Sequence, residues 1–158
     1  MSSCCQLPAQ ASTAVSCCPT SGTKGKLVEN QTVKALLTDY ALRRFAPTIH
    51  YFCPASNCEV VYFDASGSTY MKADVRARVR QKEPFGDRTV CYCFGENEAD
   101  IRREIEGHGT SAAVERVRSH IQAGRCACEV RNPRGVCCLG DVVAAVQRAE
   151  AAIRTLVR

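Results

Sequence analysis

Cysteine is the residue that most constrains this chain. The 158 residues include 12 cysteines, and every one of them stands in a closely spaced pair. The pairs are Cys4 with Cys5, Cys17 with Cys18, Cys53 with Cys58, Cys91 with Cys93, Cys126 with Cys128, and Cys137 with Cys138. In a reducing compartment, such thiols serve metal binding rather than disulfides. The pattern therefore predicts metal centres.

The start of the chain favours a reducing compartment. The residues M-S-S-C-C-Q-L-P have neither the basic n-region nor the apolar h-region of a secretory signal, so we expect a cytoplasmic protein. No apolar run reaches the roughly eighteen residues of a membrane span, so no membrane insertion is expected. A secreted disulfide scaffold is the alternative. Aromatic residues make up only 6% of the chain, and metal sites can replace part of a missing apolar core.

Residues 91–139 carry the most informative pattern. One cysteine pair opens this stretch and two close it: Cys91 and Cys93, then Cys126 and Cys128, then Cys137 and Cys138. Gly95 gives the opening pair the backbone freedom of a turn, and Asn132-Pro133-Arg134-Gly135 is a second turn that returns the chain. A [2Fe–2S] cluster needs four thiolates, two on each iron. We therefore expect the two ends to meet around one metal centre, a [2Fe–2S] cluster.

A second metal site is indicated by Cys53-Pro-Ala-Ser-Asn-Cys58. This knuckle lies between two expected strands, and two cysteines at the mouth of a hairpin are half of a tetrahedral zinc site. Cys17 and Cys18 are the nearest supply for the other half. A metal-free hairpin with two buried thiols is the alternative. His50, just before the knuckle, is expected to be a packed or solvated residue rather than a ligand.

Hydrophobic periodicity predicts an α+β fold. A tail at 1–26 is expected to be flexible. A zinc-knuckle sheet part at 27–83 and a helical [2Fe–2S]-binding part at 84–158 follow it, with the boundary in Lys82-Glu-Pro-Phe-Gly-Asp87. Strands are expected at 26–28, 48–52, 60–63, 68–70 and 75–79, and helices at 33–37, 98–106, 111–123 and 142–157. The expected helix N-caps are Thr32, Asn97, Thr110 and Asp141. His108 and His120 are expected at the surface.

These motifs resemble known families. Cys91-Tyr-Cys-Phe-Gly95, followed by a helical spacer and a cysteine-rich return, is similar to the bacterioferritin-associated-ferredoxin type of [2Fe–2S] domain. The return from Cys128 to Gly140 resembles the N-terminal domain of CopZ-type copper chaperones, and Phe52 to Phe63 resembles the zinc-binding half of that domain. The resemblance covers roughly residues 17 to 141.

The resemblance implies specific ligands. It assigns the cluster to Cys91, Cys93, Cys128 and Cys138, and leaves Cys126 and Cys137 as neighbouring alternatives. It assigns zinc to Cys18, Cys53 and Cys58, and Cys17 is the expected fourth ligand. The family often has Cys-Pro-x-Cys-Gly at the first knuckle, and this chain has Ser21 in place of the second cysteine. Serine is a poor zinc ligand, so Cys17 is expected to replace it.

The function that the resemblance implies is metallochaperone-like handling of copper or heavy metals. The cluster would give redox capacity, and Cu(I) is a further candidate cargo because thiolates prefer it. Full-length relatives also carry Met-x-Cys-x-x-Cys, and no Cys-x-x-Cys occurs in these 158 residues. Copper hand-off would therefore use a separate protein or pairs such as Cys4 and Cys5. The alternative is a ferredoxin-like electron-transfer partner without metal transport.

Charge and motifs argue against other function classes. The net charge of +5 is spread along the chain, and Arg76-Ala-Arg-Val-Arg80 lacks the interleaved aromatics of a nucleic-acid stripe. No catalytic triad, phosphate loop or paired-carboxylate motif is present, so no enzyme is expected beyond a cluster-based metal reductase. The expected partner is a copper-transport or redox protein.

Overall fold

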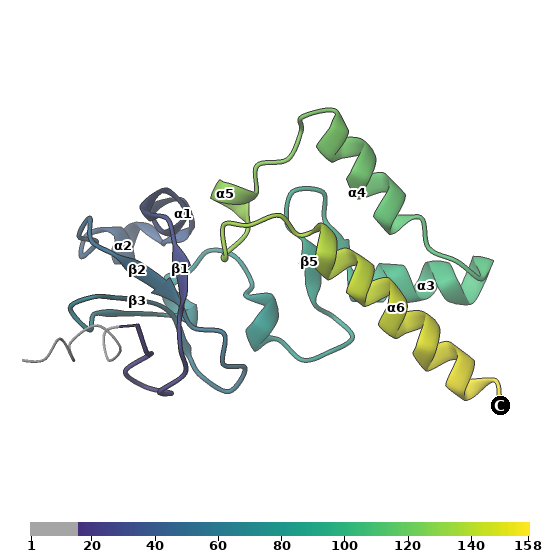
Figure 1. Cartoon of the computed structure of the whole chain (residues 1–158), viewed down its shortest axis with the longest axis horizontal. Helices are drawn as coiled ribbons and strands as arrows, with labels where there is room; N and C mark the ends of the chain where they lie inside the picture. The colour runs from purple at the N-terminus through teal and green to yellow at the C-terminus, as the bar shows by residue number, and fades with distance from the viewer. Residues whose placement is uncertain (1–15) are drawn as a thin grey trace, which may run out of the picture.

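The structure, a computed structural model, describes residues 16–158, which form a sheet part followed by a helical part (Figure 1). The mixed helix and sheet content agrees with the expected α+β class. Cys4 and Cys5, and most of the expected flexible tail, lie outside the described residues. No helix among residues 16–158 is long and apolar enough to cross a membrane.

The sheet part is built on four antiparallel strands. They are β1 (Lys26–Val28), β2 (His50–Phe52), β3 (Val60–Asp64) and β4 (Thr69–Met71), hydrogen-bonded in that order. The helices α1 (Asn30–Leu36) and α2 (Asp39–Leu42) connect β1 to β2. Val33, Leu37, Phe52 and Tyr70 are fully buried or nearly so in the main core of this part.

Strand β3 is buried along its whole length because it serves two cores. The register between β3 and β4 shifts between Val60 and Tyr62, which is the mark of a β-bulge. Val61 and Tyr62 pack in the main core with Phe52, whereas Val60 and Phe63 pack beside the thiols of the zinc knuckle. The bulge thus lets one short strand support both the fold and the candidate metal site.

The helical part begins with a short hairpin. Its strands are β5 (Thr89–Cys91) and β6 (Glu96–Asn97), and the helices that follow are α3 (Glu98–His108), α4 (Ala113–Gln122), α5 (Cys128–Arg131) and α6 (Leu139–Leu156). Helices α3 and α4 both pack against α6 (Figure 1). Val90, Ile101, Val117 and Val142 are completely buried between them, so this part has its own apolar core.

The predicted strand at 75–79 is wrong. Only Val75 forms a β-bridge, with Leu37, and the chain then runs without a strand to a 3₁₀ turn at Arg80–Lys82. Arg76 donates from Nε to the carbonyl oxygen of Leu37 at 2.8 Å, so its side chain occupies an acceptor near the bridge. Arginine and apolar residues alternate in this segment, but the segment is not a pleated strand. Its side chains make separate contacts instead.

Helix starts were predicted with mixed success. Asn97 is the N-cap of α3, where its Oδ1 accepts a hydrogen bond from the Asp100 amide at 2.8 Å, as expected. The other starts differ: α1 begins at Asn30, before the expected cap Thr32, and α4 has Ala112 as its N-cap instead of Thr110. Helix α6 begins at Leu139, so Asp141 lies in its first turn.

The two parts contact each other through the turn at 132–135. Helix α5 packs on α1 (Figure 1), and the Tyr62 hydroxyl of β3 donates to the carbonyl oxygen of Pro133 at 2.6 Å. Gly135 has φ +67° and lies so close to Thr32 that a Cβ atom there would be 2.6 Å from Oγ1. The turn that leads to Cys138 therefore rests on the sheet part. The expected domain boundary at 82–87 stays a prediction.

Candidate metal centres

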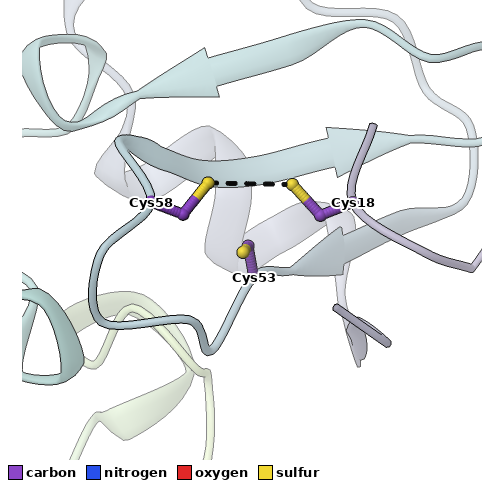
Figure 2. A group of neighbouring side chains, drawn as sticks. All are labelled: Cys18, Cys53 and Cys58. Atoms are coloured by element: carbon purple, nitrogen blue, oxygen red, sulfur yellow. Dashed lines mark hydrogen bonds between the residues drawn. The ribbon is translucent and has the colours of Figure 1, made fainter. Parts of the chain in front are cut away.

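Three cysteines from separate segments meet beside the sheet. The Sγ atoms of Cys18, Cys53 and Cys58 all lie within 4.8 Å of one another, and all three residues are buried (Figure 2). Cys53 follows β2, Cys58 precedes β3, and Cys18 comes from a turn closed by its amide donating to the Thr23 carbonyl at 2.9 Å. The hairpin thus presents two thiols, and the N-terminal turn supplies the third.

This group fits a zinc ion. Zn–S bonds of about 2.3 Å in tetrahedral geometry place neighbouring sulfurs roughly 3.8 Å apart. The Cys18 and Cys58 sulfurs are separated by 3.9 Å (Figure 2). Three thiolates without a disulfide are a donor set that zinc prefers.

The fourth position of the tetrahedron is less simple than the sequence suggested. Cys17 is not one of the three grouped thiols; it is half-buried and forms an isolated β-bridge with Lys24. Ser21 Oγ lies 3.5 Å from Cys53 Sγ, so the serine that was expected not to be a ligand lies next to the thiols. The role of Cys17 as the fourth ligand stays a prediction. His50, as expected, packs in the core: it stacks on Phe45 and contacts Asn30 Oδ1 at 2.7 Å.

Hydrogen bonds prepare the thiols for metal binding. Burial raises the pKa of Cys18, but hydrogen bonds from the backbone and side chain of Ser21 outweigh it and hold this pKa at about 7. Burial raises the pKa of Cys53, and the side chain of Ser21 and the amide of Ala55 only partly oppose it. Cys18 is therefore the thiol that ionises most readily of these two, and metal ligands must be thiolates.

The helical part brings a second set of thiols together. Cys93 Sγ lies 3.7 Å from Cys128 Sγ, and the thiols of Cys91 and Cys138 hydrogen-bond to each other. Cys91 ends β5, Cys93 lies in the turn after it, Cys128 begins α5, and Cys138 is the N-cap of α6. The alternatives weighed from the sequence, Cys126 and Cys137, are both exposed, whereas Cys128 and Cys138 are buried.

The arrangement in two pairs fits a two-iron centre. A [2Fe–2S] unit takes two thiolates on each iron, so its ligands form two close pairs rather than one compact group. Backbone amides also point at these sulfurs: Ala127 donates to Cys93 at 3.2 Å, and Cys138 donates to Cys128. Such hydrogen bonds stabilise thiolate charge and tune a cluster. The residues present therefore suit this cofactor.

The thiol pKa values in this set differ strongly. The hydrogen bond from Cys138 lowers the pKa of Cys91 to about 7, against the opposing effect of burial. Burial together with the neighbouring Cys93 raises the pKa of Cys128 to about 12, and the hydrogen bond with Cys91 followed by burial raises that of Cys138. The buried thiols of Cys91, Cys128 and Cys138 cannot all ionise together unless a positive charge lies close to them. A bound metal cation would supply that charge.

Two features near the thiols were not found from the sequence. His120 was expected at the surface, but it is half-buried and stacks on Phe94, next to Cys93, with ring centroids 4.1 Å apart. His108 is exposed as expected. Lys82 was assigned only to the domain boundary, but it is a buried residue beside the zinc knuckle. No local pattern in the sequence distinguishes it from a surface lysine.

A known family profile matches the sheet part of the chain. Residues 15–76 match a CopZ-type family profile described as a zinc binding domain. This range contains Cys18, Cys53 and Cys58, so the resemblance to CopZ-type zinc-binding domains is confirmed. The match covers the sheet part and stops before the helical part.

One relative, compared by its sequence and by its solved N-terminal domain, extends the similarity into the helical part. The chain is 34% identical over 122 residues to the copper chaperone CopZ of Archaeoglobus fulgidus, an alignment that spans 77% of this chain and 57% of that protein. The solved N-terminal domain of the same CopZ superimposes with a TM-score of 0.65 at 29% identity, and the match covers 81% of this chain and 95% of the domain. The chain thus spans little more than half the length of its curated relative. The [2Fe–2S] cluster and the ferredoxin-type relation stay predictions.

Proposed function

We propose that this chain is a metallochaperone-like protein that takes part in copper or heavy-metal handling and carries one zinc ion and one [2Fe–2S] cluster. The observation that supports this most is the separation of two groups of thiols, one beside the sheet and one among the helices. Similarity to a copper chaperone supports the assignment to copper and to a carrier rather than an enzyme. The proposed partner is a copper-transport or redox protein.

The zinc site has a structural role in this proposal. Cys18, Cys53 and Cys58 would hold the ion, with Cys17 as the predicted fourth ligand and Ser21 as the competing neighbour. A closed thiolate site contributes folding free energy, because it ties the N-terminal turn to the hairpin. Copper would therefore be handled elsewhere on the protein.

The second group of thiols has the redox role. Cys91, Cys93, Cys128 and Cys138 would hold the [2Fe–2S] cluster, which supplies one-electron chemistry and would keep copper as Cu(I). The chain's own contribution is to aim amides at the sulfurs, as Ala127 does at Cys93. Cys138 at the first turn of the long helix α6 also places negative charge at a positive dipole end.

Metal analysis of neighbouring cysteine variants tests the proposal. We expect anaerobically purified wild type to contain about two irons, about two sulfides and about one zinc per chain. Cys128→Ala and Cys138→Ala remove a buried thiol and should lose most of the iron. Their matched controls, Cys126→Ala and Cys137→Ala, remove an exposed thiol next in sequence and should keep it. Iron-free wild type, or equal loss in ligand and control variants, would contradict the assignment.

An electron-transfer module without metal transport is the second candidate. The partial exposure of Cys93 favours it, because a cluster held there would lie near the surface and could exchange electrons with a docked protein. A Cu(I) titration against a competing chelator separates the two candidates. Protection of Cys4 and Cys5, which lie outside the proposed zinc site, from alkylation by added Cu(I) supports metal handling. Reversible cluster reduction without any Cu(I) binding supports electron transfer alone.

A further inference from the structure

Lys82 is buried beside the three thiols of the zinc knuckle. Its residue is only 7% exposed, and buried lysines are rare unless their charge is compensated. Among residues 16–158 no carboxylate forms an ion pair with it. Burial lowers the pKa of Lys82, and the charges that oppose this effect are, in order of strength, those of Cys53, Cys58, Cys18 and Glu59. The thiols of the metal site are therefore its main counter-charges.

Lys82 also contacts the backbone that shapes the knuckle. Its Nζ donates to the Ala55 carbonyl oxygen at 2.7 Å, and the Cys58 amide donates to the same oxygen at 3.3 Å. The amide of Ala55 in turn hydrogen-bonds the Cys53 sulfur. Lys82 thus contacts a residue that is hydrogen-bonded to both cysteines of the knuckle.

The lysine reaches the site from the connection between the two parts of the molecule. It is the last residue of the 3₁₀ turn Arg80–Lys82. Arg80 in the same turn forms an ion pair of 2.9 Å with Asp141 of α6, and its amide donates to the Tyr92 hydroxyl at 2.9 Å. The turn is therefore held by the helical part while it presents Lys82 to the zinc knuckle.

The charge of a zinc–thiolate site explains why a lysine would lie beside it. A Zn²⁺ ion with the thiolates of Cys18, Cys53 and Cys58 carries a net charge of −1, or −2 with Cys17 as the fourth ligand, and such a charge is costly in a buried site. One ammonium group offsets one unit of this negative charge. We propose that Lys82 is the charge-balancing and positioning residue of the Cys18–Cys53–Cys58 zinc site, so that zinc retention depends on a residue outside the zinc knuckle. This inference rests on the proposed zinc site.

Zinc release from the full chain tests this. In anaerobic, cluster-loaded protein, Lys82→Met should release zinc to an excess of chromogenic chelator at least about tenfold faster than wild type. Lys82→Arg keeps the charge and should stay within about threefold of wild type. The matched control is Lys72→Met, which removes a partly exposed lysine that pairs with Glu59 beside the same knuckle, and it should stay within about twofold.

A second readout separates charge from simple packing. Lys82→Gln keeps a hydrogen-bond donor without the charge, and it should also release zinc faster. In the cobalt-substituted chain, Lys82→Gln should move the sulfur-to-cobalt charge-transfer band to longer wavelength, because sulfur electrons are no longer stabilised by a neighbouring cation. Lys82→Met and Lys82→Gln releasing zinc at the wild-type rate would overturn this inference alone. Wild type that binds no zinc would overturn the zinc site as well.

Discussion

At the residue scale, Arg116 of α4 holds the hairpin that carries Cys91 and Cys93. Its guanidinium contacts both carboxylate oxygens of Glu96, at 2.7 and 3.0 Å, and it also pairs with Glu104 of α3. Glu96 belongs to β6 and its side chain is only 9% exposed. The hydrogen bonds to Glu96 and then to Glu104 raise the pKa of Arg116, and those from Arg116 lower the pKa of Glu104.

Replacing this arginine should be costly. Arg116→Met would leave the Glu96 carboxylate buried without a charge partner, and we expect a loss of about 2 kcal/mol in the free energy of unfolding. Arg118→Met is the matched control on the same helix; it removes only an exposed pair with Glu115 and should cost less than about 0.5 kcal/mol. Urea unfolding followed by circular dichroism measures both, and equal costs would contradict the role of Arg116.

Individual site residues were predictable where one short motif carries them. The Cys53–Cys58 knuckle and the Cys91–Cys93 turn each place two thiols within a few residues. Such a pair can be recognised from one short segment of the sequence. Lys82 and Arg116 carry no such signal, because their role depends on partners that are distant along the chain. Lys82, for example, contacts Ala55 across a separation of 27 residues.

At the element scale, amphipathic helices and alternating strands were the parts that the sequence predicted best. β1 to β4 lie where they were expected, within a few residues. Helix α3 ends at His108, and Gly109 after it has a φ of +80°, which fits the expected C-cap. The hairpin β5–β6 was missed, because two strands of three and two residues are too short to show a period. Helix α5 was missed for the same reason.

Long-range contacts explain the remaining errors in element boundaries. Helix α1 includes Thr32, a good N-cap residue by type, because Thr32 is buried against Gly135 of the opposite part. Val75 to Val79 alternates like a strand, but Val75 bridges to Leu37 and Arg76 ion-pairs with Asp39. Tertiary packing overrode local propensity at both places.

At the scale of the whole molecule, side-chain contacts connect the zinc-binding part to the helical part. The Tyr62 hydroxyl of the sheet donates a hydrogen bond to the turn at 132–135. From one short turn, Lys82 contacts the zinc knuckle and Arg80 contacts the helical part. The candidate cluster ligand Cys138 lies three residues after the 132–135 turn. A substitution in the sheet that loosens this turn should therefore weaken cluster binding by the second thiol group, Cys91, Cys93, Cys128 and Cys138.

Tyr62→Phe tests this connection. Burial raises the pKa of Tyr62, so its hydroxyl stays protonated and donates to the Pro133 carbonyl throughout the working pH range. Its removal leaves a buried carbonyl unpaired, and we expect about 2 kcal/mol of destabilisation. We also expect a several-fold faster loss of the cluster's visible absorbance under an iron chelator, while the zinc content stays at the wild-type level.

Tyr40→Phe is the control for this measurement, because Tyr40 is 73% exposed and its ring lies at the surface of the sheet part. It should leave both stability and cluster retention unchanged. If Tyr62→Phe and Tyr40→Phe lose the cluster at the same rate, the turn at 132–135 does not depend on the sheet. If Tyr62→Phe instead loses zinc before iron, the hydroxyl serves the knuckle and not the helical part. The sheet stabilises the second thiol group only if Tyr62→Phe loses the cluster selectively.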